Sequence, residues 1–227
     1  MHLIILGILL VLLVFGPQWW VRYRLKKYGQ DRPDLSGTGG ELAEHLIDRF
    51  QLDGVRVQLG GRGEDYYNPD ERLVSLSPEH YHGQSIAAVA VATHEIGHAL
   101  QHQEQHKGFL RRQRRIKLAI TIERFSALAL MMAPVLLLLT RVPHSTLIML
   151  FIGLSGMLAN IWVQLTNLPV ELDASFNKAL PILSEGYLSQ NDLPAAKKVL
   201  KAAAYTYVAG ALASLLNLGR WIAIFRR

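Results

Sequence analysis

Near the middle of the chain, residues 92–101 read Ala-Thr-His-Glu-Ile-Gly-His-Ala-Leu-Gln, a stretch that contains the pattern His-Glu-x-x-His. Residues four apart on an α-helix share a face, so His94 and His98 can direct both imidazoles toward one metal ion. Glu95 directly follows the first histidine, where its carboxylate can act as a general base on a water molecule at that ion. An apolar run precedes the motif and predicts a buried helix that begins near Ser85. A helix with two incidental histidines is the alternative.

Zinc is the metal that this pattern favours. The chain contains no cysteine, so thiolate ligands are excluded and any metal must be held by histidine and carboxylate. Neutral imidazoles bind zinc at about 2.0–2.1 Å, and a catalytic zinc has three protein ligands and one open position. We predict Glu171 as the third ligand, because it follows Pro169 directly after an apolar span, with Asp173 as the second candidate. An ordinary carboxylate at a helix start is the alternative for Glu171.

Two further histidines, His102 and His106, extend the i, i+4 series beyond His98. Each step of four residues drifts about 40° around the helix, so these side chains do not converge on one ion. We interpret them as the polar end of the helix rather than as a second metal site.

The composition indicates a membrane protein. Half of the 227 residues (50%) are hydrophobic and only 19% are charged, which points to the lipid bilayer as part of the solvent. The formal net charge is +6 at pH 7, and the basic residues cluster beside apolar spans, where they set helix orientation. The basic run from Arg111 to Lys117 lies directly before such a span. We therefore predict the bilayer, and no nucleic acid, as its partner.

The apolar spans predict about four transmembrane helices in a multi-pass protein of the cell membrane. Residues 1–21 are expected to form an uncleaved N-terminal transmembrane anchor, residues 118–166 a transmembrane hairpin, and residues 202–227 a C-terminal transmembrane helix. Residues 22–117 are expected to form a cytosolic α+β domain with the His-Glu-x-x-His helix, and residues 167–201 a cytosolic helical segment with the third ligand. Both chain termini then lie outside.

The cytosolic domain carries its own local signals. Thr38 and Glu41 have the spacing of a capping box, which predicts a helix start. Alternating apolar and polar residues predict strands at 55–59 and 72–77. The second strand is expected to be an edge strand beside the metal-binding helix, where it can pair with an extended substrate backbone; a purely structural hairpin is the alternative. The predicted fold class is an α-helical membrane protein with a small zincin-like α+β domain.

The chain resembles the YugP-type bacterial neutral zinc metallopeptidases, a small membrane family, nearly from end to end. The stretches that carry the resemblance are 38–41, 85–101, 168–175 and 195–209. The resemblance implies that His94 and His98 are zinc ligands, that Glu95 is the base and that peptide bonds are hydrolysed. In the more distantly similar HtpX-type membrane peptidases, the third ligand is the Glu of a Glu-x-x-x-Asp pattern. Glu171 matches this Glu, but Ser175 stands at the Asp position, whose carboxylate usually orients a ligand histidine.

These observations predict a membrane-embedded zinc-dependent endopeptidase, with Zn²⁺ as cofactor, that hydrolyses peptide bonds at the cytosolic membrane face. Peptides or membrane-protein segments are the expected substrates, and the sequence specifies no oligomeric state. Tyr205 or Tyr207 is a candidate donor to the developing oxyanion. The alternative function is a non-catalytic membrane scaffold or adaptor stabilised by zinc. A processing peptidase for lipidated peptides is less favoured, because four spans are too few to enclose a large chamber.

Overall fold

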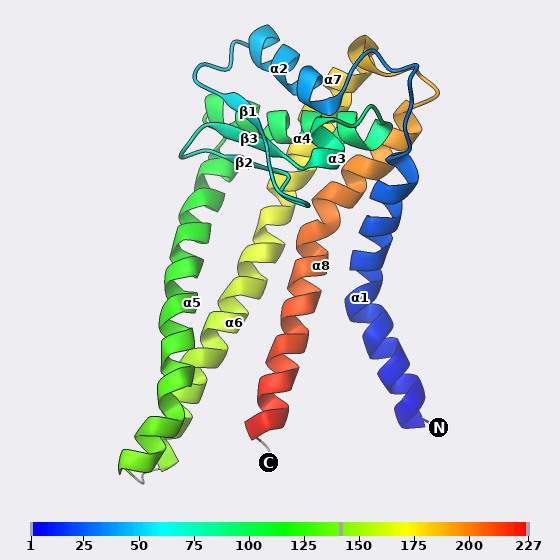
Figure 1. Cartoon of the computed structure of the whole chain (residues 1–227). Coiled ribbons are helices and arrows are strands. Elements are labelled where there is room, and N and C mark those ends of the chain that lie inside the picture. Colours follow the sequence, from blue (N-terminus) through cyan, green and yellow to red (C-terminus); the bar gives the residue numbers. More distant parts are fainter. Residues whose placement is uncertain (1, 141–142, 226–227) are drawn as a thin grey trace. The chain divides into compact units, whose positions relative to one another are not determined.

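The computed structural model describes residues 2–140 and 143–225, and most of them are helical (Figure 1). The α-helices are α1 (His2–Tyr28), α2 (Gly39–Arg49), α3 (Pro78–Tyr81), α4 (Ile86–Gln103), α5 (Lys107–Thr140), α6 (Pro143–Leu172), α7 (Leu180–Ile182) and α8 (Leu193–Phe225). The π-helical segments are η1 (Asp173–Ala179) and η2 (Leu183–Tyr187), and the strands are β1 (Arg56–Leu59), β2 (Tyr66–Asn68) and β3 (Leu73–Leu76).

The chain divides into two compact units. One unit comprises Gln18–Leu110 and Leu168–Thr206 and contains α2, α3, α4, the sheet and both π-helical segments. The other unit is made of the remaining parts of α1, α5, α6 and α8. The expectation of a helical protein with a small α+β part is thus confirmed at this level, while the number of membrane spans stays a prediction.

Helix α4 is the core of the first unit. Its first turn is capped by Ser85, whose side chain accepts a hydrogen bond from the backbone nitrogen of Ala88 at 3.1 Å. Every residue from Ile86 to Ala99 is buried, because α2, α3, the sheet and η1 all pack against this helix. The prediction of a buried helix that begins near Ser85 is confirmed.

Helix α2 starts at the predicted capping box. Glu41 donates its backbone N–H to the Thr38 hydroxyl at 3.2 Å, and its carboxylate accepts the backbone N–H of Thr38 at 2.8 Å. The next position must be glycine, because a Cβ on Gly39 would lie 2.3 Å from the carbonyl oxygen of His80 and 2.8 Å from that of Ala88. This close backbone approach lets α2 pack directly on α3 and α4.

The sheet has the strand order β1-β3-β2, with β1 parallel and β2 antiparallel to β3. The strand that we expected at residues 72–77 is therefore central, so its interpretation as an edge strand is wrong. All four residues of β3 are buried, as is typical of a strand covered on both faces. Strand β2, which sequence patterns missed because it is three residues long, forms an edge of the sheet and packs against α4.

The end of α6 also differs from expectation. We expected a new helix to start after Pro169, but α6 continues through Pro169 to Leu172 and then widens into the π-helical segment η1. Proline lacks the N–H for one helical hydrogen bond, yet the α-helix continues for three residues beyond it. Glu171 consequently lies in the last turn of a long helix rather than at a helix start.

Two glycines of α6 allow close packing within the second unit, where α5 and α6 run side by side (Figure 1). A Cβ on Gly153 would lie 2.2 Å from Leu130, and one on Gly156 would lie 2.2 Å from Ser126. Among the described residues, one helical segment, Lys107–Leu136, is long and apolar enough to cross a membrane by the criteria of length and composition.

Candidate metal centre

The three motif residues on α4 are held inside the first unit. His94, Glu95 and His98 are exposed by only 3%, 6% and 4%. Their helix is buried on all sides from Ile86 to Ala99, so it is the packing of α4 rather than an amphipathic pattern that fixes where they point. The rings of the two histidines lie 4.8 Å apart, centroid to centroid, on the same face of the helix.

Glu171 reaches this histidine pair from the last turn of α6. Its Oε2 lies 3.2 Å from Nε2 of His94 and 3.3 Å from Nε2 of His98. The carboxylate is 1% exposed, so it is as deeply buried as the two imidazoles. One donor atom from each of the three residues falls within 4.8 Å of the others, which makes this group a candidate metal centre.

Gln101 fixes the tautomer of His98. Its side-chain amide nitrogen donates to the carbonyl oxygen of Val170 at 3.0 Å and to Oδ2 of Asp173 at 2.7 Å. The amide oxygen of Gln101 must therefore be the atom that lies 2.9 Å from Nδ1 of His98. Because this oxygen only accepts, Nδ1 carries the proton, and in a neutral ring Nε2 presents a lone pair to Glu171.

Ser175 does the same for His94. Its hydroxyl donates to the carbonyl oxygen of Leu200 at 3.2 Å and lies 3.1 Å from Nδ1 of His94. A hydroxyl has one proton to donate, so it accepts a hydrogen bond from Nδ1 of the histidine. Nε2 of His94 then presents its lone pair to Glu171 as well.

Three electron-pair donors thus converge in a site that is almost fully buried. Without a cation, two neutral imidazole nitrogens and a carboxylate oxygen would repel one another there. Ligands about 2.0–2.1 Å from a tetrahedral zinc ion lie roughly 3.3 Å from each other, which matches the 3.2 and 3.3 Å separations. The residues present therefore fit a zinc ion held by two histidines and one glutamate.

Glu95 lies beside this group but is not part of it. Its carboxylate forms no hydrogen bond in the part of the chain that the structure describes. Burial raises the pKa of this carboxyl group, and the charges of Glu171 and Asp65 raise it further, against the lowering effect of the two histidines. A carboxylate with a raised pKa and no structural partner is suited to accepting and returning a proton.

The other candidates from the sequence lie outside the cluster. Asp173, the second candidate for the third ligand, accepts hydrogen bonds from Gln101 and Asn177 instead. His102 pairs with the Tyr67 hydroxyl, and Nδ1 of His106 accepts the backbone N–H of Phe109.

The two tyrosines that we considered as oxyanion donors have other contacts. Tyr205 packs edge-on against Trp20, and the Tyr207 hydroxyl accepts a hydrogen bond from Arg112. Sequence reasoning also missed Gln101, although its position three residues after His98 places it on the same side of α4.

Two histidines on one buried helix and a glutamate from a distant helix define a centre of the two-histidine, one-glutamate zinc class. Comparison with known proteins agrees with this chemistry. The family model described as "Putative neutral zinc metallopeptidase" matches residues 3–226, and the chain belongs to this family. It is 36% identical over 225 residues to the "Putative membrane protease YugP" of Bacillus subtilis (strain 168), which covers 97% of this chain and 96% of that protein. No solved structure matches the chain.

Proposed function

We propose that the protein is a membrane-embedded, zinc-dependent endopeptidase in which His94, His98 and Glu171 hold the ion and Glu95 is the general base. The observation that carries this proposal is the convergence of two imidazole lone pairs and one carboxylate oxygen beside a buried carboxylate without a structural partner. The family to which the chain belongs supports zinc as the metal.

A bound zinc ion would supply Lewis-acid activation of a water molecule and of the scissile carbonyl. The chain's own residues transfer the proton and orient the metal ligands. Glu95 accepts the proton of the attacking water and then delivers it to the leaving amine nitrogen. Gln101 and Ser175 keep both imidazoles in the tautomer that presents Nε2. The buried surroundings strengthen each of these electrostatic interactions by excluding bulk water.

The substrate backbone has a docking edge next to the centre. Strand β2 is an edge strand and packs against α4, so we assign it the pairing role that we had expected of residues 72–77. Pairing through main-chain hydrogen bonds does not depend on side chains, which suits peptides and membrane-protein segments as substrates.

The first test is metal content combined with cleavage. Purified wild-type protein is expected to carry one zinc per chain, whereas Glu171→Ala loses it and Asp173→Ala keeps it. Glu95→Gln should retain zinc and lose hydrolysis of a fluorescent casein. Full casein hydrolysis by Glu95→Gln would refute the mechanism. Zinc retention in all variants without any hydrolysis by the wild type would instead favour the scaffold alternative.

We also propose four membrane spans, both termini outside, and a metal centre that opens at the cytosolic membrane face. The chain has no cysteine, so single cysteines can be introduced without background. A cysteine at residue 62 should be labelled only after a membrane-permeable reagent is used on intact cells. Labelling of that position by an impermeant reagent would reverse the assigned orientation.

A further inference from the structure

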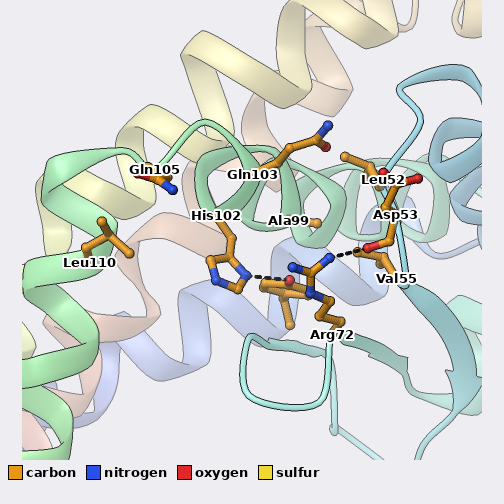
Figure 2. A pocket seen from close by; sticks show the side chains of 10 residues that line it. Leu52, Asp53, Val55, Arg72, Ala99, His102, Gln103, Gln105 and Leu110 are labelled. Carbon is orange, nitrogen blue, oxygen red and sulfur yellow. Dashed lines mark hydrogen bonds between the residues drawn. The ribbon is translucent and has the colours of Figure 1, made fainter.

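A cavity of about 460 Å³ lies on the surface of the first unit (Figure 2). Its polar lining residues include Tyr67 of β2, Arg72 and His102, and its apolar lining residues include Leu52, Val55 and Ala99. None of these side chains belongs to the proposed metal centre, so the cavity has no role in the function described so far.

The cavity lies next to the metal centre along α4. Ala99 and His102 follow Glu95 by four and seven residues, so the three side chains occupy one stripe of the helix. The ring of Phe109 connects the two places, with its centroid 6.0 Å from the ring of His98 and 5.6 Å from that of His102. The cavity therefore lies on the same side of α4 as Glu95, toward the C-terminal end of the helix.

Arg72 is the one arginine or lysine among the residues that line the cavity, and Asp53 is the one acidic residue among them. One guanidinium nitrogen donates to the backbone carbonyl of Asp53, which holds the side chain in place (Figure 2). The Tyr67 hydroxyl and Nδ1 of His102 lie 2.9 Å apart and form a hydrogen bond with each other. Burial raises the pKa of Tyr67 and lowers that of His102, so both groups are neutral at pH 7. Among the described residues, Arg72 forms no ion pair and keeps its other N–H groups available.

The backbone of Arg72 adopts a conformation that its residue type disfavours. Its φ angle is +50°, at the end of the turn between β2 and β3, where glycine or asparagine costs less. An arginine held in this left-handed conformation points to a role for the side chain rather than for the backbone.

We propose that this cavity is a specificity pocket that binds a carboxylate of the substrate through Arg72. The proposal rests on the proposed endopeptidase function and adds the class of substrate: a chain with an Asp or Glu side chain near the scissile bond, or with its C-terminal carboxylate there. Side chains of a strand paired to β2 alternate between the two faces of the sheet. Those that face α4 on the side of Tyr67 would enter the pocket, and the apolar wall would hold their methylene groups.

The experiment compares matched peptides on the full-length protein in detergent. In the first pair, the two peptides differ by Glu or Gln at one internal position, and both have an amidated C-terminus. In the second pair, both peptides have Gln at that position, and they differ by a free or an amidated C-terminus. Cleavage by the wild type is measured as kcat/KM. Binding is measured separately by fluorescence anisotropy with the zinc-loaded Glu95→Gln protein, which reports on the pocket without chemistry.

The charged member of one pair should bind about tenfold more tightly than its neutral partner, the typical strength of one charge-assisted hydrogen bond. The pair that shows the difference identifies the source of the carboxylate. Arg72→Gly should reduce the ratio to about one without loss of the folding transition, because glycine relieves the left-handed backbone. Arg72→Lys should keep most of the preference, and Arg62→Gly, a matched loss of charge outside the pocket, should keep all of it.

An unchanged binding ratio in Arg72→Gly, or no preference for either carboxylate in the wild type, would overturn the pocket assignment. The two proposals fail in different ways. Absence of hydrolysis combined with carboxylate binding that depends on Arg72 would refute the endopeptidase and retain the pocket. Hydrolysis with no dependence on Arg72 would retain the enzyme and refute the pocket.

Discussion

The hydroxyl of Ser175 lies 3.1 Å from Nδ1 of His94 and donates its own proton to the carbonyl oxygen of Leu200. Serine thus reaches the ligand histidine from the position at which the resemblance described in the sequence analysis implies an aspartate. A neutral hydroxyl can orient the imidazole, but it does not increase its basicity as a carboxylate does. The backbone carbonyl behind it makes the arrangement specific, because it determines the direction of the hydroxyl proton.

Removal of this hydroxyl should weaken zinc binding. Ser175→Ala takes away the hydroxyl that accepts the Nδ1–H of His94 in a buried site, so we expect zinc affinity to fall by roughly 10–100-fold. Competition with a chromophoric chelator measures the change. Ser184→Ala removes an exposed hydroxyl in η2 and should leave the affinity unchanged. Equal affinity of both variants would show that Ser175 does not orient the ligand.

Substitution of Gln101 should weaken zinc binding and also lower the free energy of unfolding. Gln101→Leu removes the acceptor for His98 and the side-chain donor to the carbonyl oxygen of Val170, inside a site where Gln101 is fully buried. We expect the free energy of unfolding of the metal-free protein to fall by about 1–3 kcal/mol, in addition to weaker zinc binding. Thermal unfolding in detergent with a chelator gives the first quantity. Gln103→Leu is the control on the exposed side of the same helix. It removes one exposed hydrogen bond to the carbonyl oxygen of Gln51 and should change both quantities far less.

Gly97, inside the motif, permits the approach of η1 to α4. A Cβ there would lie 2.9 Å from the carbonyl oxygen of Ala174 and 3.3 Å from the Cβ of Lys178. Gly97→Ala should displace η1, and with it Ser175, so that zinc affinity falls although every ligand is retained. Gly16→Ala, whose new Cβ meets nothing within 4 Å, is the matched control. Unaltered zinc affinity in Gly97→Ala would show that the segment can shift without cost.

Acid stability should depend on Asp65. Its carboxylate accepts hydrogen bonds from Nδ1 of His80 at 2.8 Å and from the backbone nitrogen of Ser77 at 2.8 Å. Burial by itself would raise the pKa of Asp65, but the bonds from His80 and Ser77 outweigh it and hold the pKa below its usual value.

Because the pKa of Asp65 is depressed in the folded state, its ionised carboxylate stabilises the fold at pH values above the unfolded-state pKa of about 3.9. This stabilisation is lost as the pH falls through the folded-state pKa. Asp65→Asn should therefore lower the free energy of unfolding at pH 7 and flatten its decline in acid. Denaturant unfolding of the metal-free protein between pH 7 and pH 3 measures both effects. Parallel pH curves for wild type and variant would contradict the assignment.

Local signals in the sequence predicted local structure well. The capping box at Thr38 and the buried helix that carries His94 depend on neighbours within four residues, and both are present. A carboxylate directly after an apolar span predicts Glu171 as a ligand, and the structure places its Oε2 3.2 Å from Nε2 of His94.

What the sequence could not supply were relations across long separations. Whether β3 is an edge or a central strand depends on β2, whose three residues are too few to show a periodicity. The orienting hydroxyl of Ser175 lies 81 residues from its histidine, and nothing in the local pattern indicates that they meet. Proline usually ends or kinks a helix, but α6 continues through Pro169, because packing outweighs this local preference there.

Glu171 and His94 are 77 positions apart in the chain, yet they would share one ion. Such an ion acts as a removable cross-link, because it binds the folded arrangement and not the unfolded chain. When it is withdrawn, the loop between the two segments regains its freedom and the buried donors repel one another. The protein's lifetime in the cell, and not only its activity, would then follow the supply of zinc.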